Sequence, residues 1–135
     1  KVSVGYENGF IGEGEMSYGG ANCLKRAMLA KDVVEKRLGL LPFSIKDLRL
    51  DLIGINSLLP KSDYSNEPNE VRLRVAGKTI LKTEAQQIAN EVETLYTNGP
   101  SGGGGATKKV SEIIAIASIL VPKKDIQISI TYTTL

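Results

Sequence analysis

The chain contains no histidine and only one cysteine, Cys23. These absences exclude a disulfide framework, a zinc site built from cysteine and histidine, and a Ser-His-Asp triad within the chain. A single unpaired cysteine fits a reducing compartment, so we expect a cytoplasmic protein. We predict no cofactor and no bound metal.

Neither sign of charge dominates, because 17 lysines and arginines face 15 aspartates and glutamates, for a formal net charge of +2. Nucleic acid and anionic membranes are therefore not expected partners. The longest apolar run, Ile113 to Val121, is far shorter than the ~20 residues that a membrane-spanning helix needs. No signal peptide is recognisable at the start, and we expect a soluble protein.

The chain has the size of one domain, with 135 residues of which 41% are hydrophobic. That content is enough to fill a single core. The sequence begins KVSVGYENG, without an initiator methionine and with strand-like alternation from the second residue. We expect residues 1–135 to be one domain of a longer protein.

The spacing of apolar residues predicts five strands and two helices. Strands are predicted where apolar and polar residues alternate, and helices where apolar residues recur every three or four positions. The segment 111–121 is apolar at both alternating sets of positions, so we expect its outer face to meet a partner. The predicted strands cover residues 2–7, 48–55, 70–77, 111–121 and 126–133, and the predicted helices cover residues 21–40 and 83–97.

This order, β-α-β-β-α-β followed by a terminal strand, predicts an α+β fold of the ferredoxin-like type. Two helices would cover one face of an antiparallel sheet with spatial order 4-1-3-2, leaving Arg72 and Arg74 on the other face. The three unusual connections, residues 8–20, 56–70 and 98–109, would then share one edge of the sheet. Because binding residues are common on loops that a rigid scaffold holds, we expect a binding site there.

Two of these connections are rich in glycine, which lets backbone amides approach an anion closely. One interpretation is a cradle for phosphate or carboxylate, although neither segment has the GxxxxGK[ST] or GxGxxG spacing. A flexible linker and a close backbone contact with a missing domain are the alternatives. The predicted substrate-binding residues are Gly12, Gly14, Ser17, Asn98, Ser101, Gly102, Gly103, Gly104, Gly105, Thr107 and Lys108, with Lys109 beside them.

Candidate catalytic residues lie in the first of these connections and directly before it. Glu7, Glu13 and Glu15 could supply a general base or hold a cation, and Tyr18 could orient a carbonyl or phosphate. The simpler interpretation is that the glutamates are solvated and that Tyr18 packs in the core. Cys23 has no histidine partner, so we expect a small buried side chain.

Four segments of the chain resemble one known family. They are VSVGYENGFIGEGEMSYGGANCLKRAMLA, LRLDLIGINSL, EVRLRVAG and NEVETLYTNGPSGGGGATKKVSEIIAIASILVPKK. Together they are similar to the C-terminal part of the AtuA-like family, named after a protein of acyclic terpene utilisation. The resemblance runs from Val2 to about Lys124 and leaves the tail DIQISITYTTL outside.

The resemblance implies a cytoplasmic catabolic protein. Full members of the family are several times longer than this chain. The family is associated with the degradation of citronellol- and geraniol-type acids through CoA thioesters, but it implies no catalytic residue. Its glycine-rich signatures correspond here to Gly9, Gly12, Gly14, Gly99 and residues 102–105.

Two functions are then open. In the first, the glycine-rich loops form part of a site for an anionic substrate, an acyl-CoA or a carboxylate, completed by the missing N-terminal domain. The parent protein would be an enzyme of acyclic terpenoid or acyl-CoA catabolism, and this fragment alone would be inactive. In the second, the chain is a structural or oligomerisation domain with no catalytic residues of its own. We expect a homo-oligomer.

Overall fold

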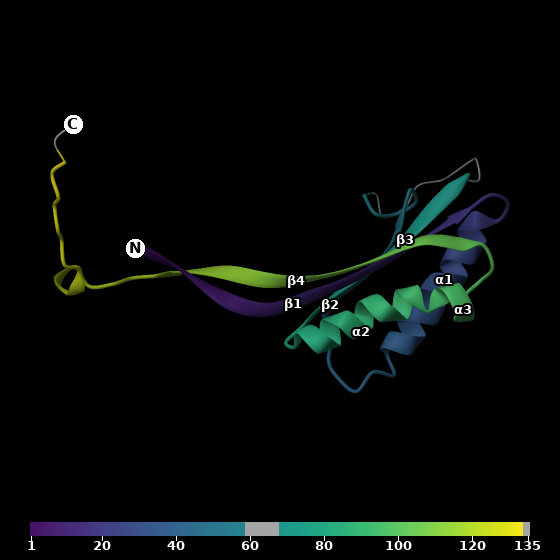
Figure 1. The fold of residues 1–135 in the computed structure, drawn as a ribbon, viewed down its shortest axis with the longest axis horizontal. Helices are drawn as coiled ribbons and strands as arrows, with labels where there is room; N and C mark the ends of the chain where they lie inside the picture. Colours follow the sequence, from purple (N-terminus) through teal and green to yellow (C-terminus); the bar gives the residue numbers. More distant parts are fainter. Residues whose placement is uncertain (59–67, 134–135) are drawn as a thin grey trace.

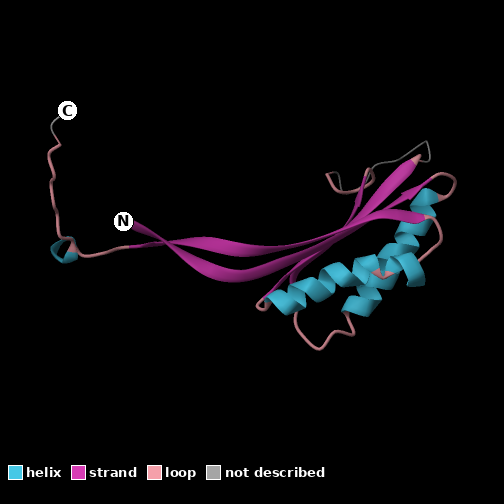
Figure 2. Ribbon diagram, viewed as in Figure 1, coloured by secondary structure: helices cyan, strands magenta, loops and turns pink. Residues whose placement is uncertain are grey.

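The computed structural model describes residues 1–58 and 68–133, which form a four-stranded antiparallel sheet with helices on one face (Figures 1 and 2). The α+β class is confirmed, and the arrangement is consistent with a ferredoxin-like type. Residues 59–67 of the predicted loop 56–70 lie outside the described part. The elements are β1 (Val2–Gly19), α1 (Cys23–Leu38), β2 (Lys46–Ile53), β3 (Glu70–Thr79), α2 (Lys82–Glu93), α3 (Leu95–Asn98), β4 (Gly103–Ile119) and the 3-10 turn η1 (Lys123–Asp125).

The strands lie in the order β2-β3-β1-β4, and every neighbouring pair is antiparallel. β1 is therefore an inner strand, paired with β3 from Phe10 to Gly19 and with β4 along nearly its whole length. Because β3 ends at Thr79, the first part of β1 has β4 as its only partner among the described residues.

The helices and the inward face of the sheet enclose one core. α2 contacts β1, β3 and β4, and α1 contacts β1, β2 and β3. Alternate positions along β3 are buried, which is the period-two pattern that the sequence predicted for a half-buried strand. The core consists of Met16, Tyr18, Cys23, Ala27, Ala30, Val34, Leu38, Leu52, Val71, Leu73, Val75, Ile88, Val92 and Leu95.

Both predicted helices form, the first with shorter bounds than expected and the second interrupted at Thr94. The first was predicted over 21–40 and runs from Cys23 to Leu38, ending at Gly39 as the sequence indicated. The second was predicted over 83–97 and divides into α2 and the single turn α3. α3 ends before Gly99, where proline follows and cannot continue a helix.

The predicted glycine-rich loop 8–20 is wrong, because these residues continue β1 as far as Gly19. Gly12 and Gly14 lie on the face that α2 covers. A Cβ atom built on Gly12 would lie 2.9 Å from the Cα of Ala85, and one on Gly14 would lie 2.7 Å from the Cβ of Val92. The glycines therefore let the sheet approach the helix closely, and they do not mark a turn.

The predicted loop 98–109 is also shorter than expected, because β4 already begins at Gly103. Its first residues pair with the end of β1, and Gly103 lies opposite Tyr18. The register shifts between Glu15 and Ser17, where β4 carries one extra residue and Gly105 has a φ of 60°. Such a bulge needs a residue that tolerates the left-handed region, and glycine does.

The predicted terminal strand over 126–133 does not form. After η1 these residues lead away from the sheet, beyond the end of β4 (Figure 1). Alternation of apolar and polar residues favours a strand only where a neighbouring strand is available. No described residue provides that neighbour.

We predict that Gly12→Ala destabilises the protein by about 1–3 kcal/mol, because overpacking of a closely packed contact costs that much. Gly104→Ala is the matched control, since a Cβ atom there meets nothing within 4 Å. It should change the free energy of unfolding by less than about 0.5 kcal/mol. Urea denaturation measures both variants, and equal midpoints for the two would contradict the packing role of Gly12.

Candidate functional site

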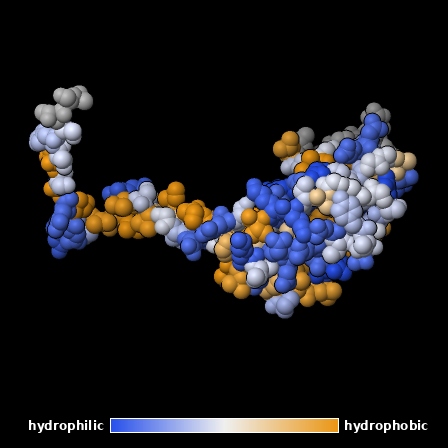
Figure 3. Space-filling model, viewed as in Figure 1, coloured by the Kyte–Doolittle hydropathy of each residue, from blue (hydrophilic) through white to orange (hydrophobic). Residues whose placement is uncertain are grey.

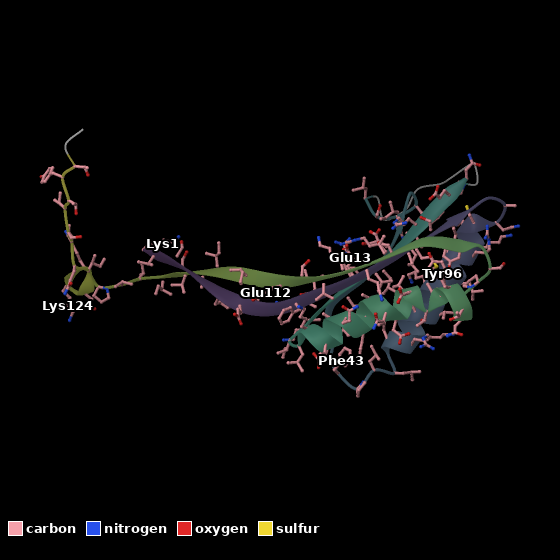
Figure 4. The ribbon with its side chains drawn as sticks, in the orientation of Figure 1. Lys1, Glu13, Phe43, Tyr96, Glu112 and Lys124 are labelled. Atoms are coloured by element: carbon pink, nitrogen blue, oxygen red, sulfur yellow. The ribbon has the colours of Figure 1, made fainter. Side chains whose placement is uncertain are left out.

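The face of the sheet away from the helices carries a cluster of paired charges. We call Glu13, Glu15, Asp51, Arg72 and Arg74 the charged face. Arg72 donates from Nε to Glu15 Oε2 at 2.6 Å. The guanidinium of Arg74, from β3, reaches carboxylates of both neighbouring strands. Its Nε lies 3.9 Å from Glu15 Oε1, its Nη1 lies 3.5 Å from Asp51 Oδ2, and it also pairs with Glu13. Glu13 lies on this sheet surface in Figure 4.

The three candidate glutamates do not form one site. In the register of the sheet, Glu7 is opposite Ile114 and Glu13 is opposite Lys109. The bulge between Glu7 and Phe10 places the Glu7 and Glu13 side chains on opposite faces of β1. Among residues 1–58 and 68–133, no three acidic, cysteine or histidine side chains gather closely enough to hold a metal ion. The carboxylates of the charged face are instead engaged by arginine.

Tyr18 is a core residue. Its side chain is fully buried, and its hydroxyl lies 3.6 Å from the sulfur of Met16. Burial raises the pKa of the Tyr18 phenol above its ordinary value, and the nearby Arg26 partly opposes this shift. The core interpretation is therefore confirmed. A phenol enclosed in this way has no open path to a substrate.

Cys23 is buried as expected, in the first turn of α1. Its thiol lies 2.9 Å from the carbonyl oxygen of Pro68, two residues before β3 begins. The contact ties the beginning of the helix to the end of the 56–70 connection. This arrangement gives Cys23 a packing role.

The segment around Ser101 presents its carbonyl oxygens to a cation. Arg26 donates to the carbonyl oxygens of Ser101 at 2.9 Å and of Ala21 at 3.1 Å, and it also binds that of Gly19. An anion-binding nest needs the opposite polarity, with backbone amides pointing at the ligand. The guanidinium of Arg26 also lies against Gly102. These contacts give the segment a structural role, while the anion cradle stays a prediction without a supporting contact.

Arg72 makes a similar connection further along β4. Besides Glu15, it contacts the hydroxyl of Ser17 at 2.8 Å, the carbonyl oxygen of Gly105 at 3.2 Å and the hydroxyl of Thr107 at 3.3 Å. Arg72 thus brings Ser17, Gly105 and Thr107 together. The guanidinium of Arg72, which these three residues surround, is already paired with the carboxylate of Glu15.

The remaining predicted binding residues lie apart from this cluster. Lys108 faces α2, where its ammonium group contacts Glu93 at 2.5 Å and Asn90 at 3.2 Å. Asn98 ends α3, and its backbone amide donates to the carbonyl oxygen of Thr94. Gly103 lies beneath the side chains of Met16 and Tyr18. Gly104 and Lys109 both lie in β4, where Gly104 is opposite Ser17 and Lys109 is opposite Glu13 of β1.

A pocket of about 590 Å³ lies where β1 leaves the body of the domain. It surrounds the bulge in β1, where Gly9 has a φ of 84°. Sequence reasoning missed this pocket, although Asn-Gly at positions 8 and 9 is a local signal for a bend. The lining residues are Glu7, Asn8, Gly9, Ser44, Lys46, Lys78, Thr79, Ile80, Leu81 and Glu84.

Beyond this pocket β1 and β4 leave the body as a two-stranded ribbon (Figure 1). We call residues 2–9 and 111–119 the apolar arm. Figure 3 shows hydrophobic side chains along this ribbon, which the helices do not cover. Ile114 is 61% exposed and Ile116 is 75% exposed, and Val2, Val4, Tyr6 and Ile119 are also exposed.

Register gives the arm two different faces. Residues directly opposite each other share a face of the ribbon. One face carries Val2, Val4 and Tyr6 against Ile119, Ala117 and Ala115, and the other carries Ser3, Gly5 and Glu7 against Ser118, Ile116 and Ile114. The apolar residues at both sets of positions in β4 were the signal for this surface in the sequence.

None of the helices in the described residues has the length and apolar character needed to cross a membrane. A family model described as "Acyclic terpene utilisation family protein AtuA" matches residues 1–132 of the chain. The match includes residues 125–132, which the resemblance noted in the sequence had left outside. No curated protein and no solved structure matches the chain.

The burial of Tyr18 predicts a pH dependence of stability. Because its pKa is raised in the folded state, the folded protein holds the phenol proton more tightly than the unfolded chain. This contribution is complete below the unfolded pKa of about 10 and is lost as the pH rises above it. Tyr18→Phe should therefore reduce the decline of the unfolding free energy between about pH 9.5 and 11, measured by denaturant titration.

Tyr132→Phe is the control for this experiment, because Tyr132 is 91% exposed in the C-terminal segment. It should leave the alkaline decline unchanged. Identical pH profiles for Tyr18→Phe and the parent chain would contradict the assignment of Tyr18 to a desolvated core.

Proposed function

The chain belongs to the acyclic terpene utilisation AtuA family, and we propose that its role within that family is assembly, through contact between the apolar arms of two copies. The observation that carries the proposal is the arm itself. A ribbon of two strands is marginally stable in water unless a further strand or a packed surface covers it. Exposed apolar patches of this kind mark interaction surfaces in soluble proteins.

The composition of the arm supports a protein partner. Between its two strands the charged residues are Glu7 and Glu112, both in the part nearer the body. The outer part of the two strands therefore carries no charged side chain, and the nearest charges beyond it are Lys1 and those of η1 at the tip. Removing Ile114, Ile116 and Val4 from water would contribute about 1.5–3 kcal/mol for each side chain that becomes fully buried.

The geometry favours assembly over an anion site for two reasons. Gly12, Gly14 and Gly103 are occupied by contacts with neighbouring side chains and backbone. The arginines near the other glycines are engaged by carbonyl oxygens and carboxylates. The proposed function therefore needs no catalytic residue in this chain, and it does not depend on where a substrate binds in the rest of a longer protein.

Charge in the arm should prevent assembly. We predict that the double variant Val4→Glu with Ile116→Glu sediments as a monomer at concentrations where the parent chain sediments as a dimer. Buried unpaired carboxylates would oppose contact on both faces of the ribbon. Analytical ultracentrifugation over a range of concentrations measures the mass.

Leu40→Glu is the matched control, because Leu40 is a large apolar residue with 84% exposure outside the arm. It should leave the dimer intact. A parent chain that stays monomeric at every concentration, or a double variant that dimerises like the parent, would overturn the proposed function.

A further inference from the structure

The C-terminal segment 126–132 has the pattern of a strand but no strand beside it. Ile126, Ile128, Ile130 and Tyr132 alternate with polar residues. Their side chains are between 49% and 91% exposed. No described residue pairs with the segment, which begins at the tip of the arm after Pro122 and η1.

An open strand edge lies in the same arm. From Val2 to Glu7, β1 is paired with β4 on one side and with no described strand on the other. An open edge of this kind presents unpaired backbone groups that can accept another strand. At its inner end the edge reaches the pocket around Glu7 and Gly9.

The segment and the edge have matching patterns. Along β1 the apolar residues Val2, Val4 and Tyr6 share one face, and Ser3 and Glu7 share the other. The segment 126–132 has the same alternation, with three isoleucines and a tyrosine on one side. Beside β1 it would place its isoleucines next to Val2, Val4 and Tyr6, and its polar residues next to Ser3 and Glu7.

Charge sets the direction of the added strand. Lys123, Lys124 and Asp125 directly precede the segment and give its start a net positive charge. The charged residues of the arm, Glu7 and Glu112, lie toward the body, whereas Lys1 lies at the tip. Figure 4 shows Lys1 and Lys124 at the far end of one chain and Glu112 nearer the body. A strand antiparallel to β1 would start near Glu7, so its net positive start would lie beside this carboxylate and far from Lys1.

A chain cannot make this pairing with itself. β1 runs from the tip toward the body, and the chain's own C-terminal segment also starts at the tip. Beside its own β1 it could only run parallel, with Lys123 and Lys124 next to Lys1. In a second copy whose arm points the opposite way, the tip lies beside the first body and its C-terminal segment starts there.

We propose that residues 126–132 of one copy add as an antiparallel strand to the free edge of β1 in the arm of a second copy. The inference rests on the proposed function, because it specifies how two arms associate. Backbone hydrogen bonds would give affinity and the alternating side chains would fix the register. A two-fold axis makes the exchange reciprocal.

Disulfide crosslinking between two different chains tests the direction and the partner. A tagged Tyr6→Cys chain is mixed with an untagged Ile126→Cys chain and oxidised mildly. Cys23 is buried in both, so the introduced cysteine is the accessible thiol. The expected product is a mixed disulfide dimer that captures the untagged chain on the tag. A Val2→Cys chain replaces Tyr6→Cys as the control and should give roughly tenfold less, because only neighbouring thiols share a high effective concentration.

Deletion of residues 126–135 provides a measurement that needs no cysteine. It should raise the dimer dissociation constant at least roughly tenfold, as measured by sedimentation. A dimer unchanged by the deletion, or one in which Val2→Cys crosslinks better than Tyr6→Cys, would overturn the strand exchange. The proposed function would then survive if Val4→Glu with Ile116→Glu still dissociated the copies, and it would fail separately if that variant had no effect.

Discussion

The fold depends on how closely the backbone of α2 can approach β1. At Gly12 and Gly14 the missing side chains leave room that the helix fills with its own backbone and with Val92. Gly77, which is paired with Gly12 across the strands, lies against Ile88 of the same helix. This contact holds the helix over the inner strands, so α2 seals the core along β1 and β4. Any larger residue would separate the two layers.

Two consequences follow for the rest of the molecule. The inward face of the sheet is committed to the helices, and the outward face satisfies its charges through arginine and carboxylate pairs between strands. The pairing of β1 with β4 continues past the N-terminal end of α2 at Lys82, where no described helix covers it. The same two strands therefore belong to the core at one end and form an exposed apolar arm at the other (Figure 2).

Local patterns in the sequence predicted the elements well and the glycines poorly. Alternation along 70–77 and helical spacing along 83–97 identified β3 and α2, because an element with one buried face has apolar residues at regular intervals in the sequence. A glycine in the sequence is ambiguous, because glycine occurs both in turns and at positions in strands where another backbone approaches closely. The local pattern around Gly12 and Gly14 predicts a turn, because the α2 residues that these glycines contact lie about 70 positions further along the chain. The sequence predicted that the two glycine-rich segments lie side by side, but it did not predict that they pair as strands of the sheet.

The candidate site could be anticipated only in part for a related reason. The apolar residues at both sets of positions in 111–121 predicted a strand whose outer face meets a partner, whereas the bulge at Gly9 was not predicted. Nor could the sequence indicate that Arg26 and Arg72 would occupy the carbonyl oxygens of the glycine-rich segments, because those arginines come from α1 and β3.

Amide hydrogen exchange at several protein concentrations tests most directly whether the arm is an interface. Exchange reports local opening of backbone hydrogen bonds. The account predicts that amides of residues 3–9 exchange faster on dilution, while those of residues 12–18, sealed beneath α2, keep the same protection. Protection of residues 3–9 that does not change with concentration would contradict it.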